Sequence, residues 1–138
     1  MQLLKVRSKI SGYKTIALLN NNLLLNYHNK IYSNKLILTN ERKIHIYEKH
    51  LSDYNKIIRG LRKTVLNPSE IIQDKNYDDT LYFIRKIKNG NQNVVVKINI
   101  SNDDEHIHNS IISSWIISDS NLKRFYKKGN CIYKNEEI

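Results

Sequence analysis

The chain has 138 residues, 40% of them hydrophobic, and a formal net charge of +10 at pH 7. This length suits one domain, or a domain with a short extension, and the hydrophobic content excludes a wholly disordered chain. The charge is uneven, because residues 1–66 hold 13 Lys/Arg against 3 Asp/Glu, whereas residues 67–138 hold 10 of each. A polyanion such as RNA, DNA or an acidic membrane surface is therefore the favoured class of partner.

Cysteine content and the first residues indicate the compartment. The single cysteine, Cys131, excludes an intramolecular disulfide and a Cys-rich zinc site, which is typical of a reducing environment. Residues 1–12 alternate basic and apolar side chains and lack the continuous apolar segment of a secretion signal or membrane span. We therefore expect a cytoplasmic protein that does not contact a membrane.

The first half of the chain is predicted to be mainly helical after a short strand. Residues 3–9 indicate a first strand, and residues 13–20 a short helix or strand. A strand over 35–39 leads to Thr39 or Asn40 as N-cap of a helix over 41–51. A second helix over 53–65 places apolar side chains on one side, namely Ile57, Ile58, Leu61 and Val65.

The second half of the chain changes to a strand pattern. Pro68 ends the second helix, and three β-rich runs follow at residues 81–88, 94–100 and 110–118. Asn89-Gly90 predicts a hairpin between the first two runs. A basic helix over 119–128, stopped by Gly129, and a last strand over 131–133 complete the chain. The fold class is α+β, with N-terminal helices packed on an antiparallel sheet. We expect a main domain over 35–138 and an N-terminal extension over 1–34 packed on it.

Two histidines on the first helix are the main candidates for chemistry. His45 and His50 lie about 140° apart around an ideal helix, so they share one pocket only if the helix ends near His50. Histidine can give or take a proton near neutral pH, which makes each a candidate general acid or base. They could equally be partly exposed helix residues without a chemical role.

Other polar side chains are candidates for binding nucleic acid. Lys97 interrupts the apolar run VVVKINI, Ser113 lies in a strand that reaches Trp115, and Arg124 lies on the last helix. These residues could contact phosphate, and Trp115 could stack on an unpaired base. The candidate cations for the backbone are Lys43, Lys49, Arg59, Arg62, Lys123 and Lys127. A solvated charged surface is the alternative interpretation of the same residues.

No metal or cofactor site is expected. His106 and His108 would share one face of a strand, but no third ligand accompanies them at a diagnostic spacing. The sequence also lacks a glycine-rich phosphate loop and a dinucleotide fingerprint.

Several motifs in a shared order resemble a known family. They are HIYEKH at 45–50, Leu66-Asn67-Pro68, Tyr82-Phe83-Ile84, VVVKINI at 94–100, Asn109 to Ser113, Leu122-Lys123-Arg124 and Ile132-Tyr133-Lys134. Over residues 35–134 the chain resembles the phage-associated branch of the barnase/EndoU/colicin/RelE-like nuclease superfamily. Ser69 replaces the acidic residue of the Asn-Pro-Asp block, and Ser113 replaces a threonine.

The resemblance implies an RNase-like fold and a metal-independent endoribonuclease. In such a reaction the ribose 2′-OH attacks the adjacent phosphate, a base and an acid move protons, and cations stabilise the phosphoryl oxygens. His45 and His50 are the predicted acid and base, in an undecided order. Lys97 and Arg124 are predicted to stabilise phosphate, and Ser113 to donate a hydrogen bond to it.

Partners and rival functions remain open from the sequence. RNA is the expected substrate, either tRNA or another single-stranded or loop RNA, and a toxin-like nuclease would need restraint by an acidic inhibitor. A non-catalytic RNA- or DNA-binding module on the same fold is the main alternative. A regulatory domain whose charge reflects only its lysine-rich composition is the other.

Overall fold

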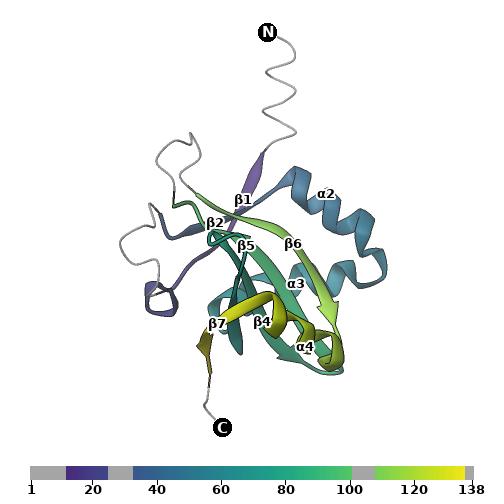
Figure 1. Cartoon of the computed structure of the whole chain (residues 1–138). Helices are drawn as coiled ribbons and strands as arrows, with labels where there is room; N and C mark the ends of the chain where they lie inside the picture. The colour runs from purple at the N-terminus through teal and green to yellow at the C-terminus, as the bar shows by residue number, and fades with distance from the viewer. Residues whose placement is uncertain (1–11, 25–32, 101–107, 136–138) are drawn as a thin grey trace.

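The computed structural model describes residues 12–24, 33–100 and 108–135. Within this part of the chain, seven strands form one sheet in the order β1-β2-β6-β5-β4-β3-β7 (Figure 1). The strands are β1 (Tyr13–Leu18), β2 (Lys35–Thr39), β3 (Glu70–Asp74), β4 (Thr80–Ile87), β5 (Gly90–Lys97), β6 (Asn109–Ile117) and β7 (Gly129–Lys134). The α-helices are α2 (Asn40–Lys49), α3 (Tyr54–Leu66) and α4 (Asp119–Lys128), with 3-10 turns η1 (Asn21–Leu23) and η3 (Leu51–Asp53). The strand predicted over 3–9 lies outside the described residues.

The predicted α+β class is confirmed, but the sheet is mixed rather than wholly antiparallel. β2 pairs with β6 in parallel, through Leu36 with Asn109 and Ile37 with Ser110. Parallel neighbours need a long connection between them, and here that connection contains α2, α3 and three strands. β3 was also not predicted. It is a short strand whose two neighbours, β4 and β7, both follow it in the chain.

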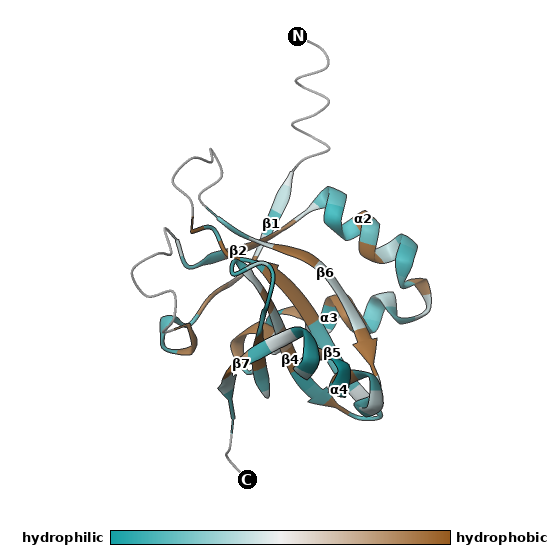
Figure 2. Cartoon of the chain, in the orientation of Figure 1, coloured by the Kyte–Doolittle hydropathy of each residue, from teal (hydrophilic) through white to brown (hydrophobic). Residues whose placement is uncertain are grey.

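The two faces of the sheet bury different side chains. Along β5, Val94 and Val96 share a core with Ile57 and Leu61 of α3. Residues one position away along a strand point to the opposite side, where Asn91 contacts α4. We call the α3 side the inner face and the α4 side the outer face. Figure 2 shows hydrophobic stretches on β5 and β6, whereas α2 and α4 are largely hydrophilic.

Helix α2 begins and ends close to the predicted positions. Thr39 caps it, because its Oγ1 accepts a hydrogen bond from the backbone N–H of Arg42 at 3.2 Å. The helix ends at Lys49, where His50 leaves the helical region at φ −135°. Ile46 is its one buried residue, so α2 is attached to the core by a narrow apolar contact.

The C-terminal half follows its local signals closely. Asn89 adopts a positive φ of 66° in the β4–β5 hairpin, as the Asn-Gly pair predicts. The predicted bounds of α4 are confirmed at both ends. Ser118 caps its start by accepting a hydrogen bond from the backbone N–H of Asn121, and Gly129 follows its last residue.

A buried polar network lies on the inner face beneath α3. The Gln92 Oε1 accepts hydrogen bonds from Thr64 Oγ1 at 3.1 Å and Arg85 Nη2 at 3.2 Å. The Gln92 Nε2 donates to the carbonyl of Ile57 at 2.9 Å and to Ser114 Oγ at 3.2 Å. These contacts tie α3 to β4, β5 and β6 through one side chain.

Candidate active site

His50 stacks on Trp115 at the place where α2 meets β6. Their ring centroids lie 5.8 Å apart with 20° between the planes. β6 pairs with β2 only through Asn109 and Ser110, so Trp115 lies beyond the paired segment. The helix end at Lys49 fulfils the condition under which both histidines could serve one site.

The surroundings of His50 lower its pKa below the usual 6.5. Burial is the largest cause, because it disfavours the charged imidazolium, and the positive charges of His45 and Lys49 add to it. Asp53 acts in the opposite direction. His45 lies on the same helix, five residues before His50. His50 is consequently neutral at pH 7, the form that can accept a proton.

Ser113 and Asn93 flank Trp115 on the outer face. Trp115 pairs across the strands with Asn93, and Ser113 pairs with Val95. Ser113 is 7% exposed. Asn93 is fully buried, and neither polar atom of its amide has a hydrogen-bond partner among the described residues. Asn93 was missed by the sequence analysis, although an asparagine next to three valines is a recognisable signal of a polar group in an apolar strand.

Lys97 lies at the end of β5, away from the position that pairs with Trp115. Four residues along β5 separate it from Asn93, a distance of about 13 Å at the usual rise of an extended strand. Its Nζ is 3.9 Å from a carboxylate oxygen of Asp79. This carboxylate offsets part of the lysine charge, so the structure places Lys97 at the margin of the candidate site.

Helix α4 brings a cluster of cations to the outer face. Phe125 anchors the helix in a small core with Ile72 and Ile84, and its ring centroid lies 6.5 Å from that of Trp115. The predicted phosphate-binding residues on this helix are exposed, namely Lys123, Arg124 and Lys127. Arg124 directly precedes Phe125, so its backbone lies close to the Trp115 side of the sheet.

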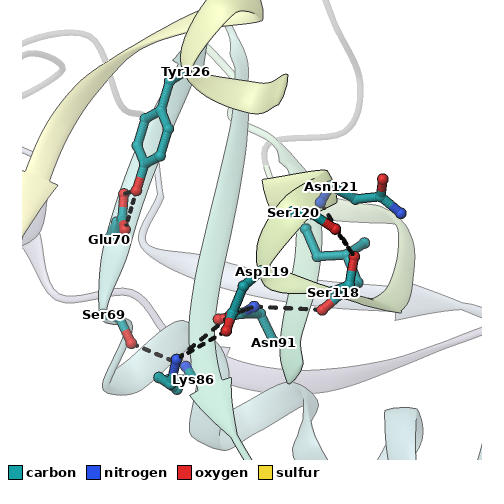
Figure 3. A network of polar contacts seen from close by, with 10 residues as sticks. Ser69, Glu70, Lys86, Asn91, Ser118, Asp119, Ser120, Asn121 and Tyr126 are labelled. Carbon is teal, nitrogen blue, oxygen red and sulfur yellow. Dashed lines mark hydrogen bonds and ion pairs between the residues drawn. The ribbon is translucent and has the colours of Figure 1, made fainter. Parts of the chain in front are cut away.

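Polar contacts at both ends hold α4 in place (Figure 3). Near its start, Asp119 accepts hydrogen bonds from Asn91 Nδ2 at 2.8 Å and from Lys86 Nζ at 3.4 Å. Further along, the Tyr126 hydroxyl donates to the Glu70 carboxylate, at 2.5 Å to Oε1 and 2.8 Å to Oε2. Burial, with this hydrogen bond, raises the pKa of Tyr126 to about 12.

The remaining predicted cations lie on the exposed sides of α2 and α3. Lys49, Arg59 and Arg62 are all exposed, and Arg59 Nε donates to the carbonyl of Asn55 at 3.2 Å. Lys43 lines a cavity of about 440 Å³ on α2. These residues give α2 and α3 exposed positive side chains.

Of the two histidines considered for metal binding, one lies within the described residues. His108 lies near Tyr13, with ring centroids 5.7 Å apart, and His106 lies outside the described residues. Across residues 12–24, 33–100 and 108–135, the side chains of His, Cys, Asp and Glu form no cluster of three that could hold a metal ion. In the same residues, no helix has the length and apolar character needed to span a membrane.

A comparison with protein-family models places the chain in a nuclease-like class. Residues 19–134 match a family of such enzymes, described as phage-Barnase-EndoU-ColicinE5/D-RelE like nuclease2, and the chain belongs to that family. The resemblance predicted from the motifs is thereby confirmed. Searches among curated proteins and among solved structures found no significant match.

Proposed function

We propose that the protein is a metal-independent endoribonuclease whose active site is centred on His45 and His50. The observation that carries this proposal is the stacking of His50 on Trp115 at the end of α2, the helix that also carries His45 five residues earlier. Two imidazoles can provide both proton transfers that cleavage by a ribose 2′-OH requires. Because the chain belongs to a nuclease family, we take a phosphodiester as its substrate.

Within this proposal the two histidines have different roles. His50 has a lowered pKa and is neutral at pH 7, so it is the general base that takes the proton of the 2′-OH. The 2′-oxygen then attacks the adjacent phosphorus and the bond to the 5′-oxygen breaks. His45, in its protonated form, gives a proton to the departing 5′-oxygen. The products are a 2′,3′-cyclic phosphate and a 5′-hydroxyl.

Cations around the histidines would stabilise the charge that develops on the phosphoryl oxygens. Lys49 directly precedes His50 and already acts on it electrostatically, which makes it a better placed cation than Lys97. Arg124 is a second candidate cation, since it is exposed on α4 next to Phe125, whose ring lies near Trp115. Ser113 is largely buried, so its role would be to position Trp115 rather than to contact phosphate.

RNA cleavage by histidine variants tests the proposal. His45→Gln and His50→Gln should each reduce the single-turnover rate roughly 10²- to 10⁴-fold, the usual contribution of acid–base catalysis. EDTA should leave the rate of the unmodified protein unchanged, and end mapping should find cyclic phosphates. His108→Gln is a matched control, because His108 packs beside Tyr13 and has no role in the proposed mechanism. Full activity of the double variant His45→Gln/His50→Gln, or loss of activity in EDTA, would contradict the mechanism.

A non-catalytic RNA-binding module is the second candidate. The pairing of Lys97 with Asp79 favours it, because the carboxylate offsets part of the charge that was predicted to contact phosphate. This function predicts salt-sensitive binding of RNA, no cleavage products, and equal binding by the histidine variants. If the enzyme is active in its host cell, an acidic protein that covers the basic surface would be a suitable inhibitor.

A further inference from the structure

A cavity on α2 lies outside the histidine pair and has a distinct composition. Its volume is about 440 Å³, and its lining residues are Asn40, Lys43, Ile44, Tyr47 and Tyr54. Four of them lie on α2, and Tyr54 is the first residue of α3. The lining includes a lysine and no carboxylate. The two tyrosines and the lysine together suit a planar group attached to an anion.

Two large side chains of the cavity, Tyr47 and Ile44, are exposed, whereas Tyr54 packs partly against the core. Tyr47 is 50% exposed and Ile44 is 54% exposed, in a protein whose core excludes solvent from most large apolar residues. Tyr47 and Tyr54 meet edge to face, with ring centroids 5.1 Å apart and 82° between their planes. This arrangement fixes the rings without stacking one on the other, so a third planar group can stack against them.

The positive charge around the cavity favours a negatively charged ligand. The segment from α2 to α3, residues 40–66, holds 7 Lys/Arg and 3 Asp/Glu. Lys43 and Tyr47 are four residues apart and therefore share one side of α2. His50 follows Tyr47 by three residues, about 5 Å along the helix axis. If a base of a nucleic-acid strand entered the cavity, the phosphate next to that base would thus lie close to His50.

We propose that this cavity binds an unpaired nucleobase of the RNA strand, with Tyr47 as the stacking residue and Lys43 as the contact to the adjoining phosphate. The proposal rests on the proposed function in taking RNA as the ligand, and it adds that the bound segment is single-stranded. A base in a duplex is stacked on its neighbours and cannot reach Tyr47. Single strands are commonly held by this combination of stacking and cationic contact.

Binding of an uncleavable strand tests the cavity apart from the chemistry. The probe is a fluorescein-labelled 2′-O-methyl RNA oligonucleotide, which lacks the nucleophilic hydroxyl, and its duplex form is the comparison. Tyr47→Ala should weaken single-strand binding between about 5-fold and 150-fold, the range for loss of one stacked base. Tyr47→Phe should bind within about twofold of the unmodified protein, because it keeps the ring. Tyr77→Ala is a matched control, since Tyr77 is 66% exposed in the β3–β4 connection.

Salt dependence separates the two contacts. Lys43→Ala should reduce the slope of log K against log salt concentration by about 0.7, the value for one phosphate on a single strand. Tyr47→Ala should weaken binding without changing that slope. An abasic substitution in the probe should weaken binding to the unmodified protein and have no further effect on Tyr47→Ala.

The result that overturns the proposal is unchanged single-strand affinity in both Tyr47→Ala and Lys43→Ala. The cavity would then be a binding surface for another ligand, such as an acidic protein. Equal loss of affinity for single strand and duplex in Tyr47→Ala would also overturn it, since only an unpaired base can enter. Because this binding assay does not require cleavage, absence of ribonuclease activity would refute the proposed function and leave the base-binding proposal to be judged separately.

Discussion

Gly60, in the middle of α3, leads to a prediction opposite to the usual helix rule. In an exposed helix, alanine in place of glycine stabilises by about 1 kcal/mol. Here an added Cβ would lie 2.1 Å from Gln92 Oε1 and 2.7 Å from Arg85 Nη2. The Gln92 amide is fixed by its contacts to Thr64, Arg85, Ile57 and Ser114, so it cannot move aside without breaking them.

The structure gives the size of this effect. A displaced Gln92 amide loses at least one neutral hydrogen bond, about 1 kcal/mol, and one to the Arg85 guanidinium, about 1.5–3 kcal/mol. After subtraction of the helix-propensity gain, Gly60→Ala should lower the free energy of unfolding by about 1.5–3 kcal/mol. For a chain of this length that is a fall in melting temperature of roughly 5–10 °C.

Thermal and urea unfolding followed by circular dichroism measure the change. Gly60→Ala should be destabilising alone and neutral or stabilising in a Gln92→Ala background, because the main obstruction is then gone. Asn55→Ala, at an exposed position of α3, controls for the effect of an added alanine. A higher melting temperature for Gly60→Ala in the otherwise unmodified protein, or equal effects in the two backgrounds, would refute this reasoning.

Three further predictions concern ionisable groups. Trp115 is the only tryptophan of the chain, so its fluorescence should titrate with His50 at a midpoint below pH 6.5, and this titration should disappear in His50→Gln. Because folding lowers this pKa, the associated stability is complete above pH 6.5 and is lost as the pH falls below it. His45→Gln removes a like charge and should raise the pKa of His50 in an NMR titration; an unchanged or lowered value would show that His45 does not repel the charged form of His50. Tyr126→Phe leaves the Glu70 carboxylate without its hydroxyl donor and should lower the free energy of unfolding by about 1.5–3 kcal/mol. An ultraviolet titration of the same variant should show one fewer tyrosine ionising near pH 12, and the contribution of Tyr126 to stability, present below pH 10, should be lost as the pH rises toward 12.

The elements that the sequence predicted well are those with local signals at their ends. α4 has a serine cap before it and a glycine after it, and the Asn89-Gly90 pair adopts the hairpin backbone that its residues favour. β3 has no such signal. Its five residues become a strand because β4 and β7 supply hydrogen bonds on both sides, which is tertiary information.

The candidate site was predictable in its residue types and less so in its arrangement. HIYEKH identified His45 and His50, and the interruption of VVVKINI identified Lys97. The stacking of His50 on Trp115 joins residues from α2 and β6, and no spacing along the chain could indicate it. The separation of Lys97 from Trp115 could not be predicted either, because it depends on the register between β5 and β6.

The parallel pairing of β2 with β6 has a consequence for how the chain folds. β3 to β6 can form by local hairpins and short connections. β2 can join the sheet only when Leu36 pairs with Asn109, which lies far along the chain. Closing so long a loop costs conformational entropy before any contact repays it, so docking of β1, β2 and α2 onto β6 should be the late and slow event. His50 belongs to the segment that docks, and Trp115 belongs to the strand that receives it. The two rings therefore meet only when folding is complete, and a partly folded chain would keep them apart.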